Sequence, residues 1–187
     1  MIKTFVIFSC LISSAWSHAQ EYGALIGVHQ TEAELGAASG SSVKGKMGFK
    51  AGLAMAFGLA DQMRFRTGAI YNQRHFESSN GSQAGETKYN FDYVDVPANL
   101  QFNFNDKVSV FGGMIIGVNI NDDVKYPTGV TAADPDIEKM IPLLNAGVNL
   151  LFDDMIGFDF YIERGMGDIA DGLKNYSTFG GNFLYWY

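Results

Sequence analysis

"YVDVPANLQFNFNDKVSVFGG", residues 93–113, decides the fold, because apolar and polar side chains alternate along it, stop at Asn105-Asp106-Lys107 and then alternate again. A period of two is the pattern of a β-strand, whose successive side chains point to opposite faces. Two such runs joined by a short polar segment predict a β-hairpin. A soluble barrel exposes the polar face of this hairpin to water, whereas a membrane barrel exposes the apolar face to lipid.

The same period recurs along the chain and predicts eight strands, at about 21–30, 45–59, 63–77, 88–104, 108–121, 141–152, 155–165 and 175–187. Short connections are expected at 60–62, 105–107 and 153–154, and long polar ones at 31–44, 78–87, 122–140 and 166–174. Short and long connections therefore alternate strictly. This asymmetry is typical of bacterial outer-membrane barrels, which have short periplasmic turns and longer extracellular loops.

The composition of the two strand faces indicates their orientation. In 93–104 the apolar face is Val94, Val96, Ala98, Leu100, Phe102 and Phe104, and the other face is Asp95, Pro97, Asn99, Gln101 and Asn103. A soluble barrel would expose the polar face to water. Along the strands, however, that face is rich in Gly, Ala, Asn and Ser and has few charges, which suits a narrow, filled interior. We therefore predict an all-β protein, an eight-stranded antiparallel up-and-down transmembrane β-barrel with its apolar face in lipid.

Ten polar residues on the predicted inward face form a candidate lumen network: Lys50, Arg64, Arg66, Asp95, Asn99, Gln101, Asn145, Asn149, Asp159 and Glu163. The cations lie on the second and third strands and the anions on the fourth and seventh. We interpret the network as a plug that pairs charges which would be costly to bury singly. The alternative is a narrow path for protons or small solutes.

The first 19 residues have the pattern of a signal peptide, with Lys3 before the apolar residues 5–8 and 11–12, and with Ser17 and Ala19 before the expected cleavage site. Residues 20–187 are then the barrel domain. Cys10, the single cysteine, lies in the removed segment, which excludes a disulfide framework or a thiol nucleophile in the mature chain. Removal leaves 12 Lys and Arg against 20 Asp and Glu, a balance that argues against nucleic acid as a partner.

The chain ends with "FGGNFLYWY", residues 179–187, in which Phe179, Phe183, Tyr185 and Tyr187 share one face. Aromatic residues there would form the periplasmic girdle of a barrel. A final amphipathic strand with a terminal aromatic residue also resembles the signal that the outer-membrane assembly machinery recognises. The alternative interpretation is an ordinary aromatic edge strand.

A lipid hydrolase is the enzymatic alternative. "RHFESSNG" at 74–81 places His75, Glu77 and Ser79 on alternate, outward positions near the outer end of a strand, where a base, an acid and a hydroxyl would reach acyl esters. Three polar residues where a strand enters a loop are commonplace, so we expect no enzyme. His29 is expected to face the lumen, and the acidic segment 121–140 to be a solvated loop, since its spacing is not that of a calcium site.

The chain resembles a known family in three segments. "YVDVPANLQF" at 93–102, "VSVFGGMIIGV" at 108–118 and "LLNAGVNLLFDDMIGFDFYIERGMGDI" at 143–169 are similar to strands and turns of the PorT-like outer-membrane β-barrel family. The resemblance implies the fold and an outer-membrane location, and it supplies no catalytic residue. The sequence departs from the family pattern at Ala98-Asn99, where the family is usually apolar.

The sequence thus predicts a small outer-membrane barrel with a structural or surface-interaction role, without cofactor or metal. A narrow channel is the first alternative and a hydrolase using His75 the second. Expected partners are outer-membrane lipid, lipopolysaccharide and the assembly machinery, and the expected state is a monomer. Pro97 cannot donate a hydrogen bond to a strand ladder, so we predict a β-bulge at that residue.

Overall fold

The computed structural model describes residues 20–35, 41–80, 86–127, 137–153, 155–170 and 173–187. The predicted signal peptide, with Cys10, lies outside the described residues. No described helix is long and apolar enough to cross a membrane.

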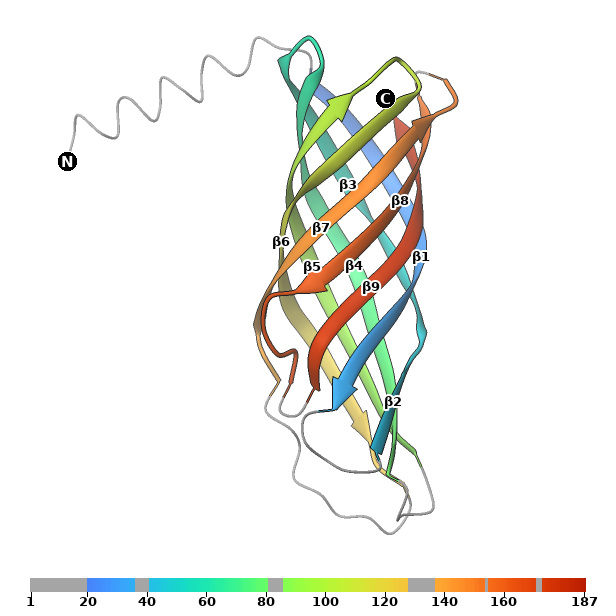
Figure 1. Ribbon diagram of the computed structural model, residues 1–187, viewed down its shortest axis with the longest axis vertical. Helices are drawn as coiled ribbons and strands as arrows, with labels where there is room; N and C mark the ends of the chain where they lie inside the picture. Colours follow the sequence, from blue (N-terminus) through green and yellow to red (C-terminus); the bar gives the residue numbers. More distant parts are fainter. Residues whose placement is uncertain (1–19, 36–40, 81–85, 128–136, 154, 171–172) are drawn as a thin grey trace, which may run out of the picture.

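The strands form one closed antiparallel sheet (Figure 1). They are β1 (Gln20–Leu35), β2 (Ser41–Gly45), β3 (Met47–Ala60), β4 (Met63–Asn80), β5 (Glu86–Asn103), β6 (Val108–Lys125), β7 (Met140–Leu151), β8 (Ile156–Gly165) and β9 (Leu173–Trp186). Sequential strands pair in order and β1 pairs with β9, which closes the barrel. Because β2 and β3 both pair with β4 and are separated only by Lys46, they occupy one position. The predicted eight-stranded up-and-down barrel is confirmed.

Short turns lie at one end of the barrel, which we call the turn end; the opposite end is the loop end (Figure 1). Two of the turns are held by a side chain. The Asn105 side-chain oxygen accepts hydrogen bonds from the backbone N–H of Lys107 and Val108, both at 2.8 Å. Asp153 accepts from Met155 at 2.9 Å and from Ile156 at 2.7 Å. Asn and Asp favour turns because their short side chains can bond the backbone a few residues ahead.

The two faces of the strands are oriented as the alternation predicts. On β5, Asp95 and Gln101 are buried in the lumen, whereas Val96, Leu100 and Phe102 are exposed on the outside. The exposed apolar side chains continue around the barrel as a belt that includes Ile26, Val28, Leu53, Val110, Met114, Leu144, Val148, Phe160, Ile162 and Phe179. A closed sheet with this belt satisfies its backbone hydrogen bonds without help from the surrounding lipid.

Several strands extend a few residues past the predicted boundaries at the loop end. β4, β5 and β6 each contain 18 residues, and segments expected as loops at 31–44, 78–87 and 122–140 are partly strand. The predicted boundaries were too short there because the added residues, such as 78–80 and 122–125, include few apolar side chains. Phe76 and Phe91 point inward, while His75 and Glu77 point outward. Outward side chains beyond the apolar belt have no need to be apolar.

The predicted bulge at Pro97 is also wrong. β5 and β6 keep their register through Pro97, which lies opposite Ile115, and the register shift of this pair lies between Asp92 and Tyr93. Between β4 and β5, Thr67 pairs with Ala98 and the next pair is Ile70 with Asp95. The register is the same on both sides of this gap. The missing N–H of proline is therefore accommodated by a short gap in one ladder, without an extra residue.

Candidate functional site

The lumen is the candidate site, and its filling changes along the barrel axis. A lower charged layer, centred on Arg66 and Asp159, lies nearer the turn end. An upper charged layer, consisting of Lys50, Arg74, Asp95 and Glu163, lies next to it on the side of the loop end; upper and lower refer to the barrel with its turn end down, the reverse of Figure 1. A cluster of apolar side chains, which we call the plug, follows at the loop end.

In the lower layer, Arg66 of β4 reaches across the lumen to Asp159 of β8. Its two terminal nitrogens donate to the two carboxylate oxygens at 3.3 and 2.7 Å. Asn149 donates to the same carboxylate at 2.7 Å, and the guanidinium lies 4.9 Å from the centre of the Phe111 ring. Such a two-point contact between ionised groups is a strong and directional form of hydrogen bonding. Gly147 leaves room for it, since a Cβ there would lie 2.5 Å from Phe111 Cζ.

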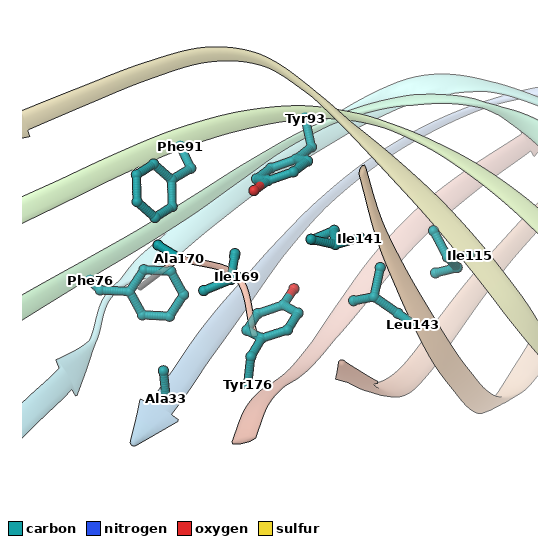
Figure 2. Packing of buried hydrophobic residues seen from close by; sticks show 10 residues of the cluster. All are labelled: Ala33, Phe76, Phe91, Tyr93, Ile115, Ile141, Leu143, Ile169, Ala170 and Tyr176. Atoms are coloured by element: carbon teal, nitrogen blue, oxygen red, sulfur yellow. The ribbon is translucent and has the colours of Figure 1, made fainter. Parts of the chain in front are cut away.

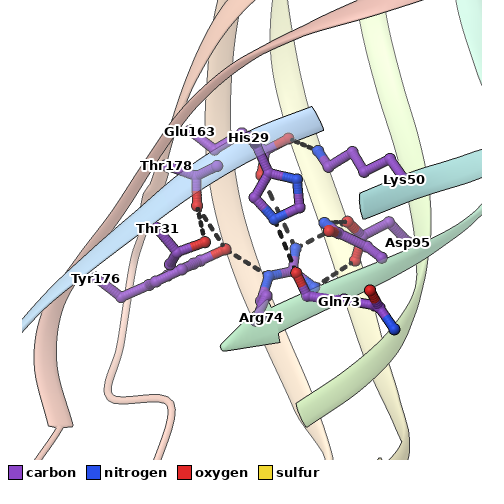
Figure 3. A network of polar contacts seen from close by, with 10 residues as sticks. His29, Thr31, Lys50, Gln73, Arg74, Asp95, Glu163, Tyr176 and Thr178 are labelled. Carbon is purple, nitrogen blue, oxygen red and sulfur yellow. Dashed lines mark hydrogen bonds and ion pairs between the residues drawn. The ribbon is translucent and has the colours of Figure 1, made fainter. Parts of the chain in front are cut away.

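In the upper layer, two cations are matched by two anions (Figure 3). Arg74 donates to both oxygens of Asp95, at 3.0 and 2.8 Å, and Asn72 donates to Asp95 at 2.7 Å. Lys50 pairs with Glu163, whose second oxygen lies 3.9 Å from Arg74. All four charged side chains are almost completely buried. Removal of one partner would leave an uncompensated charge in the lumen, which is costly.

The plug closes the lumen at the loop end (Figure 2). Its buried members are Ala33, Phe76, Phe91, Tyr93, Ile115, Ile141, Leu143, Ile169, Ala170 and Tyr176. Ile169 and Ala170 belong to the connection after β8, and Ala170 forms a β-bridge with Ile137, so two connections contribute to the closure. The Arg74 guanidinium lies 4.7 Å from the centre of the Tyr93 ring and also donates to the Tyr176 hydroxyl. The plug and the upper layer are therefore one packed unit.

A vestibule and a small cavity lie in the described part of the lumen. A vestibule of about 620 Å³ opens at the turn end, and a cavity of about 40 Å³ lies between the charged layers. Asn99, Asn145 and Asn182 line the small cavity, and their side-chain oxygens accept no hydrogen bond from the residues that the structure describes. A polar cavity of this size holds about one to three water molecules. It can hydrate the charged layers, but it does not form a pore.

All ten predicted lumen residues lie on inward faces. Eight are buried: Lys50, Arg66, Asp95, Asn99, Gln101, Asn149, Asp159 and Glu163. Asn145 is half-buried, and Arg64 lies in the vestibule, where it pairs with Glu21 at 2.6 Å. Arg74 is the central residue that sequence reasoning missed. Its even number places it on the same face of β4 as Arg64 and Arg66, so the period of two was a usable signal.

Two histidines, His29 and His75, lie in the described part of the chain. His29 is buried in the lumen and its Nε2 lies 2.8 Å from the backbone oxygen of Gln73. His75 points outward, and no hydrogen bond joins it to Glu77 in the described part of the chain. Glu77 instead pairs with Lys46 and, at 3.6 Å, with Lys88, and the hydrogen bond from Lys46 lowers the pKa of Glu77. The backbone of Ser79 pairs with Ser42 on one side and with Glu86 on the other.

The four aromatic residues predicted to form the C-terminal assembly signal lie on the outward face. Phe179, Tyr185 and Tyr187 are exposed, Phe183 is half-buried, and the rings of Tyr22 and Tyr187 stack at 6.3 Å. Among the residues that the structure describes, no group of three or more His, Cys, Asp or Glu side chains is placed to hold a metal ion.

Comparison with known proteins identifies the architecture. The family model described as outer membrane protein beta-barrel domain matches residues 14–171. Neisserial surface protein A has 13% identity, with 88% of this chain and 96% of that chain covered and a TM-score of 0.57.

Two further solved structures show the same fold. The attachment invasion locus protein Ail of Yersinia pestis, crystallised with the heparin analogue sucrose octasulfate, has 17% identity and a TM-score of 0.58. The match covers 90% of this chain and 99% of that chain. OprG of Pseudomonas aeruginosa has 12% identity and a TM-score of 0.54, and the match covers 90% of this chain and 97% of that chain. No curated protein matches the sequence.

Proposed function

Because the chain belongs to the outer membrane protein beta-barrel domain family and is a small outer-membrane barrel, we propose that it is a non-conducting scaffold that presents its loop end for surface interactions. Within this family we place it with the PorT-like barrels, on the strand resemblances at 93–102, 108–118 and 143–169.

The filled lumen carries this proposal. The Arg66–Asp159 pair crosses the lumen above the vestibule, and the upper layer and the plug follow. An eight-stranded barrel is just wide enough for side chains to fill it. Opening a path would require separating buried ion pairs as well as unpacking the plug, and each step is unfavourable. The rigid interior supports a constant arrangement of the strands that project at the loop end.

Conductance in planar bilayers tests the proposal. We expect the full-length barrel, refolded in detergent and inserted into the bilayer, to show no single-channel steps above background. A shift in gel mobility on heating serves as the control for folding. Discrete conductance steps from protein that shows this shift would overturn the proposal.

We further propose that β9 carries the signal for outer-membrane assembly. The outward positions of Phe179, Tyr185 and Tyr187 support it, since aromatic side chains at this end of the strand remain accessible before the barrel closes. Replacing Tyr187 by Ala is expected to reduce the folded protein found in outer-membrane fractions several-fold. Leu59→Ala, an exposed apolar change on β3 at the same end, is the matched control. Equal amounts of both variants would contradict the proposal.

A further inference from the structure

Among the residues that the structure describes, one edge of β6 has no strand partner at the loop end. It pairs with β5 as far as Lys88 with Lys125. Its pairing with β7 ends at Val118 with Met140, followed by one hydrogen bond from Asn119 N–H to Lys139 O at 2.9 Å. In the described part of the chain, residues 121–125 of β6 therefore have a strand partner on one side only. An unpaired edge presents N–H and C=O groups that a further strand can bind.

A hollow lies at the start of this edge. The register of β5 and β6 shifts there, because Asp92 pairs with Asn121 while Tyr93 pairs with Asn119, which leaves Ile120 without an opposite residue. The hollow has a volume of about 470 Å³ and is lined by the apolar residues Val118, Ile120, Ile137 and Met140 and by the polar residues Asn119, Asp122 and Lys139. Ile120 and Met140 are 54% and 61% exposed. The hollow can therefore receive an apolar side chain at the border of the apolar belt.

We propose that the 121–125 edge of β6 and the adjoining hollow bind an extended segment of a partner protein, which adds to the sheet as a strand antiparallel to β6. Strand addition derives its affinity from backbone hydrogen bonds and its specificity from pockets for alternate side chains. The segment places an apolar side chain in the hollow at its membrane-proximal end. This inference rests on the proposed surface-interaction role and names its partner class.

The carboxylate of Asp122 favours a cation at the opposite position of the added segment. Asp123 is neutralised by Lys125 at 2.9 Å. Asp122 lines the hollow together with Lys139, and no ion pair is formed by Asp122 in the described part of the chain. A Lys or Arg of the added strand placed opposite Asp122 would pair with its carboxylate. Opposite charges across neighbouring strands stabilise their pairing.

The direction of β6 argues against a second copy of the chain as the occupant. β6 runs from the turn end to the loop end (Figure 1), and it does so in every copy embedded in one membrane. Two copies would thus meet with both β6 strands running outward, and the strand tilt of about 35–45° would make the two edges cross. An antiparallel partner must run toward the membrane, which a separate extended segment can do.

Peptide binding to the full-length barrel in detergent micelles tests the inference. The probe is a fluorescein-labelled, capped seven-residue peptide of alternating valine and threonine, with one lysine near its N-terminus and a leucine near its C-terminus. The control peptide has the same side chains and is N-methylated at alternate residues, which removes N–H donors from one edge. We expect saturable binding of the probe by fluorescence anisotropy and little binding of the methylated peptide.

A charge exchange locates the site. Asp122→Lys is expected to weaken binding of the probe by about tenfold, as for the loss of a charged hydrogen-bond partner, and a probe with glutamate in place of lysine should recover the affinity. Asp106→Lys makes the same charge change in a turn at the opposite end and should have little effect. Met140→Glu should weaken binding of both probes, because it places a charge in the hollow.

Absence of probe binding, equal binding of the methylated peptide, or equal effects of Asp122→Lys and Asp106→Lys would overturn the edge site. These outcomes are distinct from failure of the proposed function. Channel conductance would contradict the closed scaffold, whereas a barrel that neither conducts nor binds the probe would contradict only the strand-addition site.

Discussion

The lower charged layer and the plug fill the same lumen with opposite chemistry. Arg66 and Asp159 occupy the section that the apolar belt surrounds, and Phe76 and Phe91 occupy the section beyond the belt. In lipid the outer face must be apolar, so polar residues fall inward. In water the outer face can be polar, so apolar residues fall inward as in a soluble barrel. The face on which the apolar side chains lie therefore indicates whether lipid or water surrounds the barrel. The period of two indicates only that the segment is a strand.

The largest expected effect comes from breaking an ion pair of the upper layer. Asp95→Ala leaves Arg74 buried without its two-point partner and should lower the free energy of unfolding by about 3–5 kcal/mol. The double variant Arg74→Met with Asp95→Leu should cost far less, since it removes both charges. Urea titration of the folded barrel in lipid vesicles measures both. Equal losses in the single and double variants would contradict a charge-based explanation.

A charged side chain introduced on the outer face tests where along the barrel lipid gives way to water. Ala98→Arg lies on the outward face of β5 within the belt and should cost about 2–4 kcal/mol of unfolding free energy. His75→Arg lies outward on β4 beyond the belt and should cost about 0–1 kcal/mol. The same urea titration compares them. The proposed boundary would be misplaced if the two substitutions were equally destabilising.

Truncation of a plug side chain tests packing without charge. Leu143 is fully buried, so Leu143→Ala should lower the unfolding free energy by about 2–3 kcal/mol through lost contacts and a residual cavity. Leu144→Ala on the outward face of the same strand is the control and should cost less, because lipid refills the space. A larger loss at Leu144 than at Leu143 would show that the plug is loosely packed.

The smallest effect is expected at His75. His75→Ala should leave the lipid A and phospholipid profiles of intact cells unchanged, because Glu77 is engaged by Lys46 and Lys88 rather than by His75. Mass spectrometry of extracted lipids checks this, with His29→Ala as the comparison for a buried histidine. An altered acyl pattern in the His75 variant alone would support the hydrolase alternative.

Local patterns were sufficient to predict the strands and the inward residues. Asp95, Gln101, Asp159 and Glu163 could be assigned to the lumen because the period of two depends only on the backbone of a strand. The extensions at the loop end, such as 78–80 and 122–125, were missed because they include few apolar side chains. The Pro97 bulge was wrong because a gap in one ladder is also compatible with the missing N–H.

The sequence by itself determined the barrel, its lipid face and the set of polar residues inside it, because each follows from alternation and turn residues along a short stretch of chain. Only the tertiary structure decided the partners: Arg66 with Asp159, Arg74 with Asp95 and Lys50 with Glu163. These pairs are 93, 21 and 113 residues apart in the chain. They meet because closure and register set which side chains share a level of the lumen. The edge at 121–125 of β6, which has one strand partner in the described part of the chain, has the same origin, since it depends on where β7 begins to pair.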